Sequence, residues 1–429
     1  MPLKIKKCSS RIRFRGAVLT AVLSVSCCAD NALAAIDTIL EHGPSSNRVN
    51  TFFLGDGYTA SDISTGTYTT HVQNYVDYMF ANSVNSDPYY RYRNFFNLYK
   101  VNVVSNQSGA DVPQSGIVKD TALDATYRYD GVTDRLLYIN QTKANTALNN
   151  ALVGTGKTAQ MKFITVNETV YGGGGGSYAV YAGGNSSARE IALHENGHSF
   201  SNLADEYGGT TTAYTGSEPG EINVTTSSTG VKWSAWLGYN DPTGGVVGAY
   251  NGGRYYDSGI YRPTSNSKMR ALGVPFNAIG REKIIKDIYS LVRPLDSYTS
   301  NSSTLINPPT IFCTEVDPNV IDTQWFVDGI LNATFNNASV IDVNSLGLNV
   351  GSHLISLRAY DPTGFDSVNG WVRTNTSLLE QQVAWNVTIV PEPGTVTLLS
   401  LIGGILLIRR PQIRRPRRDD KIIMHQQRA

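Results

Sequence analysis

Cysteine is scarce in this chain, and what there is of it lies mostly at one end. The 429 residues include 4 cysteines, and only Cys313 lies beyond residue 28. A single cysteine cannot form an intrachain disulfide, so covalent cross-links are excluded from the body of the chain. Cys313 also lies far in sequence from the residues singled out below, which makes it a poor candidate for a nucleophile.

Long hydrophobic runs are absent as well. The first apolar run, Gly16–Ala29, is 14 residues long and follows six basic residues within positions 1–15. A permanent membrane-spanning helix needs about 20 apolar residues, so a membrane anchor is the weaker interpretation. The run is followed by Ala32-Leu-Ala34, a small-x-small cleavage site. We therefore predict a secretory signal peptide over residues 1–35, removed by signal peptidase after Ala34 or Ala35.

The second apolar run, Thr395–Ile408, follows Val390-Pro-Glu-Pro-Gly394 and precedes a cluster of six arginines. This order over residues 391–418 resembles the PEP-CTERM sorting signal, with residues 419–429 left as a polar tail. The resemblance implies transient insertion of the tail in the inner membrane and recognition by an exosortase. A tail that stays in place as an anchor is the alternative. Both readings predict an exported protein, extracellular or attached to the surface of a bacterium with an outer membrane.

The body of the chain lacks excess positive charge. Of 36 basic and 35 acidic residues, the leader holds 6 and 1 and the segment after Ile408 holds 8 and 2. The remainder therefore has 22 basic and 32 acidic residues, a net charge of −10. This balance favours solubility and disfavours binding to nucleic acid.

The most informative motif is His194-Glu-Asn-Gly-His198. Two histidines four residues apart project from one face of a helix, where they can share a zinc ion with Glu195 beside them as a general base. Ser187 and Glu190 have the spacing of a capping box, which predicts the helix start. Gly197 disfavours a helix interior by roughly 1 kcal/mol relative to Ala, so it predicts close approach of another segment.

The third metal ligand is Asp205 or Glu206. On a straight helix Asp205 would lie about 10 Å further along the axis than His198 and could not reach the same ion. If the chain turns back near residues 201–202, Asp205 closes a His-His-Asp site. The geometry favours Asp205 over Glu206.

Several segments in one order resemble the secreted bacterial metallopeptidases known as IgA peptidase-like, over about residues 46–295. Besides 194–200 and 203–207, the resemblance rests on Leu54-Gly-Asp-Gly-Tyr-Thr59, Ser108-Gly-Ala-Asp111, Lys119–Asp124, Tyr171 with its glycines, Tyr261-Arg-Pro-Thr264 and Ser267-Lys-Met-Arg270. Two departures are Ser201, where the family usually has glycine, and the lack of room for an extra β-rich domain ahead of the catalytic one. The resemblance implies that Met269 lies beneath the metal ligands; an ordinary buried methionine is the alternative. Tyr207 and Tyr261 are candidate donors to an oxyanion, although either can be purely structural.

The chain between its two ends is expected to form two domains. Residues 36–298 are predicted to form an α/β (α+β) zincin-like domain, with a strand at 49–54 and a helix at 278–292. Residues 299–390 are predicted to form an immunoglobulin-like β-sandwich, with strands at 323–327, 338–343, 353–360 and 382–390. Such a module can serve as a spacer, a stabilising element or a docking element. The five glycines 172–176 are read either as the rim of a substrate cleft or as a mobile surface hairpin.

Taken together, the sequence predicts a secreted zinc metallopeptidase, with an endopeptidase favoured over an exopeptidase. Its substrate would be a protein or peptide, cleaved by zinc-activated water with Glu195 as general base. The alternative is a surface adhesion or matrix protein that keeps the peptidase fold in an inactive or latent form.

Overall fold

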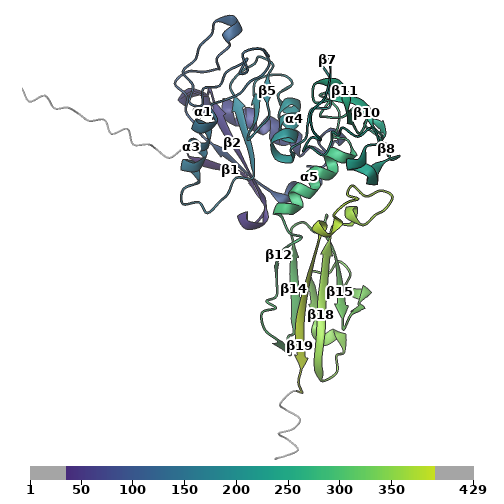
Figure 1. The fold of residues 1–429 in the computed structure, drawn as a ribbon. Coiled ribbons are helices and arrows are strands. Elements are labelled where there is room, and N and C mark those ends of the chain that lie inside the picture. Colours follow the sequence, from purple (N-terminus) through teal and green to yellow (C-terminus); the bar gives the residue numbers. More distant parts are fainter. Residues whose placement is uncertain (1–34, 392–429) are drawn as a thin grey trace, which may run out of the picture.

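The computed structural model describes residues 35–391 (Figure 1). The predicted signal peptide, apart from Ala35, and the predicted sorting signal and polar tail, apart from Pro391, lie outside these residues. Within residues 35–391, no helix combines the length and the apolar character needed to cross a bilayer.

A six-stranded sheet forms the centre of the N-terminal part. Its strand order is β1-β3-β2-β4-β6-β5, with the four inner strands parallel and both edge strands antiparallel to their neighbours. The strands are β1 (Ile36–Glu41), β2 (Val49–Asp56), β3 (Phe96–Val101), β4 (Met161–Val166), β5 (Gly173–Gly174) and β6 (Ala179–Ala182). All eight residues of β2 are buried, as expected for a central parallel strand covered on both faces. The strand predicted at 49–54 is confirmed and extends two residues further.

Helices cover both faces of this sheet. Phe53 and Phe163 point to the face that packs against α2 (Thr67–Met79) and α4 (Ala188–Ser201). Phe52 and Ile164, one residue along each strand, point to the opposite face with α3 (Gln141–Leu152). This follows from the alternation of side chains along a strand. The short helix α1 (Ala60–Ser64) begins with a complete capping box between Thr59 and Asp62.

A smaller region follows α4. Strands β7 (Thr210–Ala213), β10 (Tyr250–Gly253) and β11 (Tyr256–Arg262) form a three-stranded sheet, and β8 (Asn240–Asp241) pairs with β9 (Gly245–Val246). Helix α5 (Ala278–Leu291) confirms the helix predicted at 278–292 and packs against α4. The N-terminal part is therefore a mixed α/β structure with several sheets.

The C-terminal part consists of strands and short 3₁₀ turns. One sheet has the order β12-β14-β17 and the other β13-β19-β18-β15-β16. The strands are β12 (Leu295–Tyr298), β13 (Leu305–Ile306), β14 (Thr310–Glu315), β15 (Asp322–Val327), β16 (Ile330–Leu331), β17 (Val340–Asp342), β18 (Gly351–Tyr360) and β19 (Glu380–Ile389). The four predicted strands correspond to β15, β17, β18 and β19. Trp325 and Trp385 stack between the sheets with ring centroids 5.6 Å apart.

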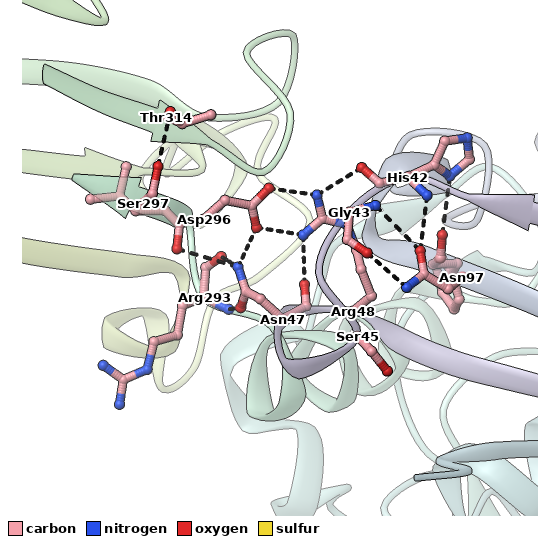
Figure 2. Close-up of polar contacts among 12 residues, drawn as sticks. His42, Gly43, Ser45, Asn47, Arg48, Asn97, Arg293, Asp296, Ser297 and Thr314 are labelled. Carbon is pink, nitrogen blue, oxygen red and sulfur yellow. Dashed lines mark hydrogen bonds and ion pairs between the residues drawn. The ribbon is translucent and has the colours of Figure 1, made fainter. Parts of the chain in front are cut away.

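The two parts share an extensive polar boundary. Arg48 binds both carboxylate oxygens of Asp296 at 2.5 and 2.6 Å, and Asn47 donates to the same carboxylate at 2.7 Å (Figure 2). The carboxylate of Asp361 in the C-terminal part is fully buried and accepts from Arg91 and from two tyrosine hydroxyl groups, Tyr92 and Tyr289, at 2.6–2.9 Å. One buried apolar cluster also runs from the central sheet through α5 to Trp325. The boundary is thus built like the interior of a domain.

Candidate metal centre

Helix α4 brings the two motif histidines together. Nε2 of His194 and Nε2 of His198 lie 3.2 Å apart, so both rings face the same point. The helix ends at Ser201, and Asn202 adopts the left-handed conformation (φ 49°) that reverses the chain. The turn therefore forms one residue after position 201, and serine at that position is accommodated inside the helix.

The predicted capping box at the start of α4 is wrong. The side chain of Ser187 makes no capping hydrogen bond. Glu190 instead extends away from the helix start, to the ammonium group of Lys268, the hydroxyl group of Tyr78 and the backbone N–H of Gly273. A tertiary ion pair with a buried lysine has displaced the local interaction that the spacing suggested.

The reversed chain returns Asp205 to the histidines. Oδ1 of Asp205 lies 3.1 Å from Nε2 of His194 and 3.3 Å from Nε2 of His198. The three atoms therefore form a nearly equilateral triangle. This Oδ1 atom is buried and has no hydrogen-bond donor among the described residues, whereas Oδ2 accepts from Tyr255 at 2.5 Å. An unpaired buried carboxylate oxygen beside two imidazole nitrogens is the arrangement expected of a metal ligand.

Glu206, the other candidate ligand, points elsewhere. It is buried and accepts hydrogen bonds from Asn223, Ser267 and Asn277. Its backbone N–H donates to the carbonyl oxygen of Met269 at 2.8 Å. The structure therefore places Asp205, and not Glu206, beside the two histidines, while Glu206 holds the surrounding loops.

Backbone carbonyl groups orient both imidazole rings. Nδ1 of His194 donates to the carbonyl oxygen of Lys268 at 2.9 Å, and Nδ1 of His198 donates to that of Leu203 at 2.6 Å. Each ring thereby keeps its Nε2 lone pair for the shared point. Neither partner could be found from the motif, because the carbonyl groups belong to loops outside the helix.

The charges of the centre are strongly coupled. Burial would raise the pKa of Asp205, but the two imidazole groups beside it hold that pKa well below the ordinary value. Burial would lower the pKa of His198, yet Asp205 and the charge of Glu195 raise it to about 9. Without an ion, the aspartate thus draws positive charge to the site, which is the charge that a metal cation supplies.

Glu195 lies beside the triangle and outside it. Ligand-capable atoms of Glu195, His194 and His198 all lie within 4.8 Å of one another, a grouping able to hold a metal ion. Glu195 is buried, and burial raises the pKa of its carboxyl group, while the two histidines oppose the shift. A raised pKa suits a carboxylate that accepts and returns a proton.

Close contacts around α4 leave room only for glycine. A Cβ on Gly197 would lie 2.6 Å from the sulfur of Met269, so the close approach predicted at this position is confirmed, and Met269 is buried directly against the helix. A Cβ on Gly173 would lie 2.4 Å from Ile191, and one on Gly175 would lie 2.6 Å from Cβ of His198. The glycine run thus packs tightly on α4. This packing fits the rim of a cleft and not a mobile hairpin.

Two adjoining cavities open at the metal centre. Both are lined by His194, Glu195, Arg135 and Tyr207. The larger, about 760 Å³, extends along Gly173–Ser177 to Tyr255, and the smaller is about 250 Å³. Tyr261 lines neither cavity. Tyr255 and Arg135 line the larger cavity but lie in segments that contain no recognisable motif, so the sequence did not indicate either residue.

Tyr255 is held over the site by a tight turn. Arg254 and Tyr255 connect β10 to β11 in the left-handed conformation, with φ of 50° and 71°. Their backbone N–H groups donate to the carbonyl oxygens of Asp205 and Tyr207 at 2.8 and 3.0 Å. The turn thereby fixes both the backbone and the carboxylate of the third candidate ligand.

Comparison with known protein families gives one match. The family model described as IgA Peptidase M64 matches residues 38–245 and 239–288. These ranges include α4, Asp205 and Met269, and they end before the C-terminal strands. No curated protein matches the chain significantly.

Proposed function

This chain belongs to the IgA peptidase M64 family, and we propose that it is a zinc-dependent peptidase that uses His194, His198 and Asp205 as ligands and Glu195 as general base. Membership supports a metallopeptidase that acts on proteins or peptides. The identity of the metal, the role of each residue and endopeptidase action are our proposals.

The triangle of donor atoms is the observation that carries the proposal. Zinc bonds of about 2.0–2.1 Å in a tetrahedron place neighbouring ligand atoms about 3.3 Å apart. The three separations among the imidazole nitrogens and Asp205 Oδ1 are 3.1, 3.2 and 3.3 Å. Two nitrogens and one carboxylate oxygen also form a donor set typical of catalytic zinc, with a fourth position left for water.

The residues around the centre supply the remaining chemistry. A zinc ion held here would polarise the scissile carbonyl group and make a bound water more acidic. Glu195, buried beside the triangle, would take a proton from that water and return it to the leaving amine. Tyr207, which lines both cavities together with His194 and Glu195, would donate to the peptide carbonyl oxygen as it develops negative charge.

The finer fold assignment belongs to the same proposal. We infer a zincin-like catalytic domain at residues 36–294 and an immunoglobulin-like domain at 295–390; the boundary lies a few residues before the expected 298/299, because β12 (Leu295–Tyr298) pairs with β14. The mixed sheet with α4 behind it supports the first, and the two facing sheets around Trp325 and Trp385 support the second. Export by a cleaved signal peptide and an exosortase-type C-terminal signal is proposed from the sequence alone.

The test pairs metal analysis with proteolysis of a peptide library. Wild type, Glu195→Gln and the control Glu41→Gln should each bind about one zinc per chain. Wild type and control should cut the library, and Glu195→Gln should be slower by about 100-fold or more, as expected for a lost general base. Glu41 is an exposed residue of β1, so its substitution tests the loss of one carboxylate away from the cleft.

Two outcomes would contradict the proposal. Absence of bound zinc in wild type would remove the metal centre. Stoichiometric zinc without any cleavage would favour the alternative, a surface-binding protein that retains the peptidase fold in inactive form.

A further inference from the structure

The smaller cavity carries two arginines that form no salt bridge with any described residue, although the charge of Glu195 on the same wall acts on Arg135. Within residues 35–391, neither Arg135 nor Arg270 has a carboxylate oxygen within 4 Å. Arg254, in the larger cavity, is a useful contrast because it pairs with Glu221 at 3.0 Å. Two guanidinium groups and one carboxylate line this cavity, so its side chains carry an excess of positive charge that attracts an anionic group from outside the chain.

Most N–H groups of these two arginines have no hydrogen-bond acceptor among the described residues. Arg135 makes one long hydrogen bond, 3.4 Å to the hydroxyl group of Tyr207, and its guanidinium lies 5.9 Å from the centre of that ring. Arg270 donates one N–H to the carbonyl oxygen of Glu206 at 2.9 Å. A guanidinium has five N–H donors in a fixed fork, so each group retains donors suited to a carboxylate.

Part of the wall is apolar. Ile191, Ala271 and Leu272 line the cavity together with the ring of Tyr171. A surface of this kind accommodates the methylene groups between a carboxylate and a peptide backbone. With a volume of about 250 Å³, the cavity suits one side chain and not an extended peptide.

His194 and Glu195 also border this cavity, which places it beside the position of bond cleavage. We propose that it is a substrate subsite that binds a carboxylate next to the scissile bond through Arg135 and Arg270. This inference rests on the proposed peptidase function and names its substrate class, peptides with an anionic group at that position. The carboxylate can come from an aspartate or glutamate side chain or from the C-terminus of the substrate.

The experiment measures kcat/KM of the zinc-loaded protein on matched peptides. One pair differs only by glutamate or glutamine next to the cleaved bond, with the C-terminus amidated. The second pair contains no acidic residue and ends in a free or an amidated carboxylate. Wild type should prefer the anionic member of at least one pair by about tenfold or more, and the pair that shows the preference identifies the source of the carboxylate.

Arg135→Gln should remove most of this preference by slowing the anionic peptide alone. Arg270→Gln should act in the same direction, and its melting temperature shows whether the fold is kept. Arg93→Gln is the control for net charge, because Arg93 is exposed, stacks on Tyr90 and lies outside both cavities. It should leave the preference unchanged.

The outcomes separate this inference from the proposed function. Cleavage without any anionic preference would overturn the subsite and leave the peptidase intact. An equal loss on both members of a pair in Arg135→Gln would show that Arg135 acts on the reacting carbonyl, which also overturns the subsite. If wild type cuts nothing, the peptidase proposal fails. The dissociation constants of the same peptides for Glu195→Gln then test the subsite separately. Equal constants for the two members of each pair would overturn the subsite as well.

Discussion

The carbonyl oxygen of Lys268 lies 2.9 Å from Nδ1 of His194, although 74 residues separate the two in sequence. The side chain of the same lysine is buried and pairs with Glu190, one helical turn before His194 on α4. The segment that orients the histidine is thereby held to the helix that carries it. The ion pair thus helps to position His194 in the candidate metal centre.

Lys268→Met should therefore weaken metal binding as well as the fold. The substitution keeps the backbone carbonyl group that orients His194 but loosens the segment that carries it, and disturbing such a partner lowers metal affinity by about tenfold or more. Removing one member of a buried ion pair destabilises a protein by about 3–5 kcal/mol, because the other charge stays buried alone. Competition with a calibrated chelator and urea unfolding measure the two effects. Lys283→Met is the control, since Lys283 also pairs with a carboxylate, Asp287, but on the partly exposed face of α5; equal effects of both variants would contradict the positioning role.

The pH dependence of stability should carry the signature of Glu190. Burial would raise the pKa of Glu190, but the hydrogen bond and charge of Lys268 bring it below the ordinary value. A carboxyl group with a lowered pKa in the folded state stabilises the protein above its ordinary pKa. That contribution is lost as the pH falls through the lowered value. In the presence of a chelator, the difference in free energy of unfolding between wild type and Glu190→Gln should shrink from pH 7 towards pH 3; a difference that grows on acidification would reverse the assignment.

Substitutions of Asp205 and Glu206 should have different effects, the first on zinc affinity and the second on stability. Asp205→Ala removes one of three proposed ligands and should reduce zinc affinity by at least about 100-fold while leaving most of the fold intact. Glu206→Gln should retain zinc and lose stability, because its carboxylate accepts three buried side-chain hydrogen bonds. Zinc content after gel filtration, with thermal unfolding, checks both. Retained zinc in Asp205→Ala would exclude Asp205 as a ligand.

Gly175→Ala should disturb the metal centre through packing alone. The added methyl group would lie 2.6 Å from Cβ of His198, an atom that cannot move without shifting α4 or the ring. We expect lower zinc affinity and a destabilisation of about 1–3 kcal/mol, the range for overpacking. Gly220→Ala is the matched control, because nothing lies within 4 Å of a Cβ there and its backbone φ is not positive. Similar behaviour of the two variants would show that the glycine run tolerates side chains.

The sequence predicts the metal helix well because the required information is local. Spacing by four residues places His194 and His198 on one face whatever surrounds the helix. The strand at 49–54 and the helix at 278–292 follow from composition and periodicity for the same reason. The sequence could not decide whether Asp205 reaches the two histidines, because its position depends on the left-handed conformation of Asn202 and on the turn at Tyr255.

Where local patterns misled, a distant partner was responsible. Ser187 and Glu190 have the spacing of a capping box, but the buried ammonium group of Lys268 binds the glutamate more strongly than a helix start can. Arg135 carries no motif, and its position beside Glu195 results from the packing of its loop against Gly173. Such residues become visible only when the chain is folded.

The buried carboxylate of Asp361 has a mechanical consequence. Because it and the Arg48–Asp296 pair hold the C-terminal sheets against the α/β part, bending between the two parts would break buried charge-assisted hydrogen bonds. Strands β18 and β19, ten residues each, extend away from the metal centre over about 30 Å at about 3.3 Å per residue (Figure 1). The two parts therefore move as one rigid body. If the far end of β19 were attached to a surface, the cleft would stand at a fixed distance from that surface and in a fixed orientation. That distance and orientation would limit which substrates can reach the cleft.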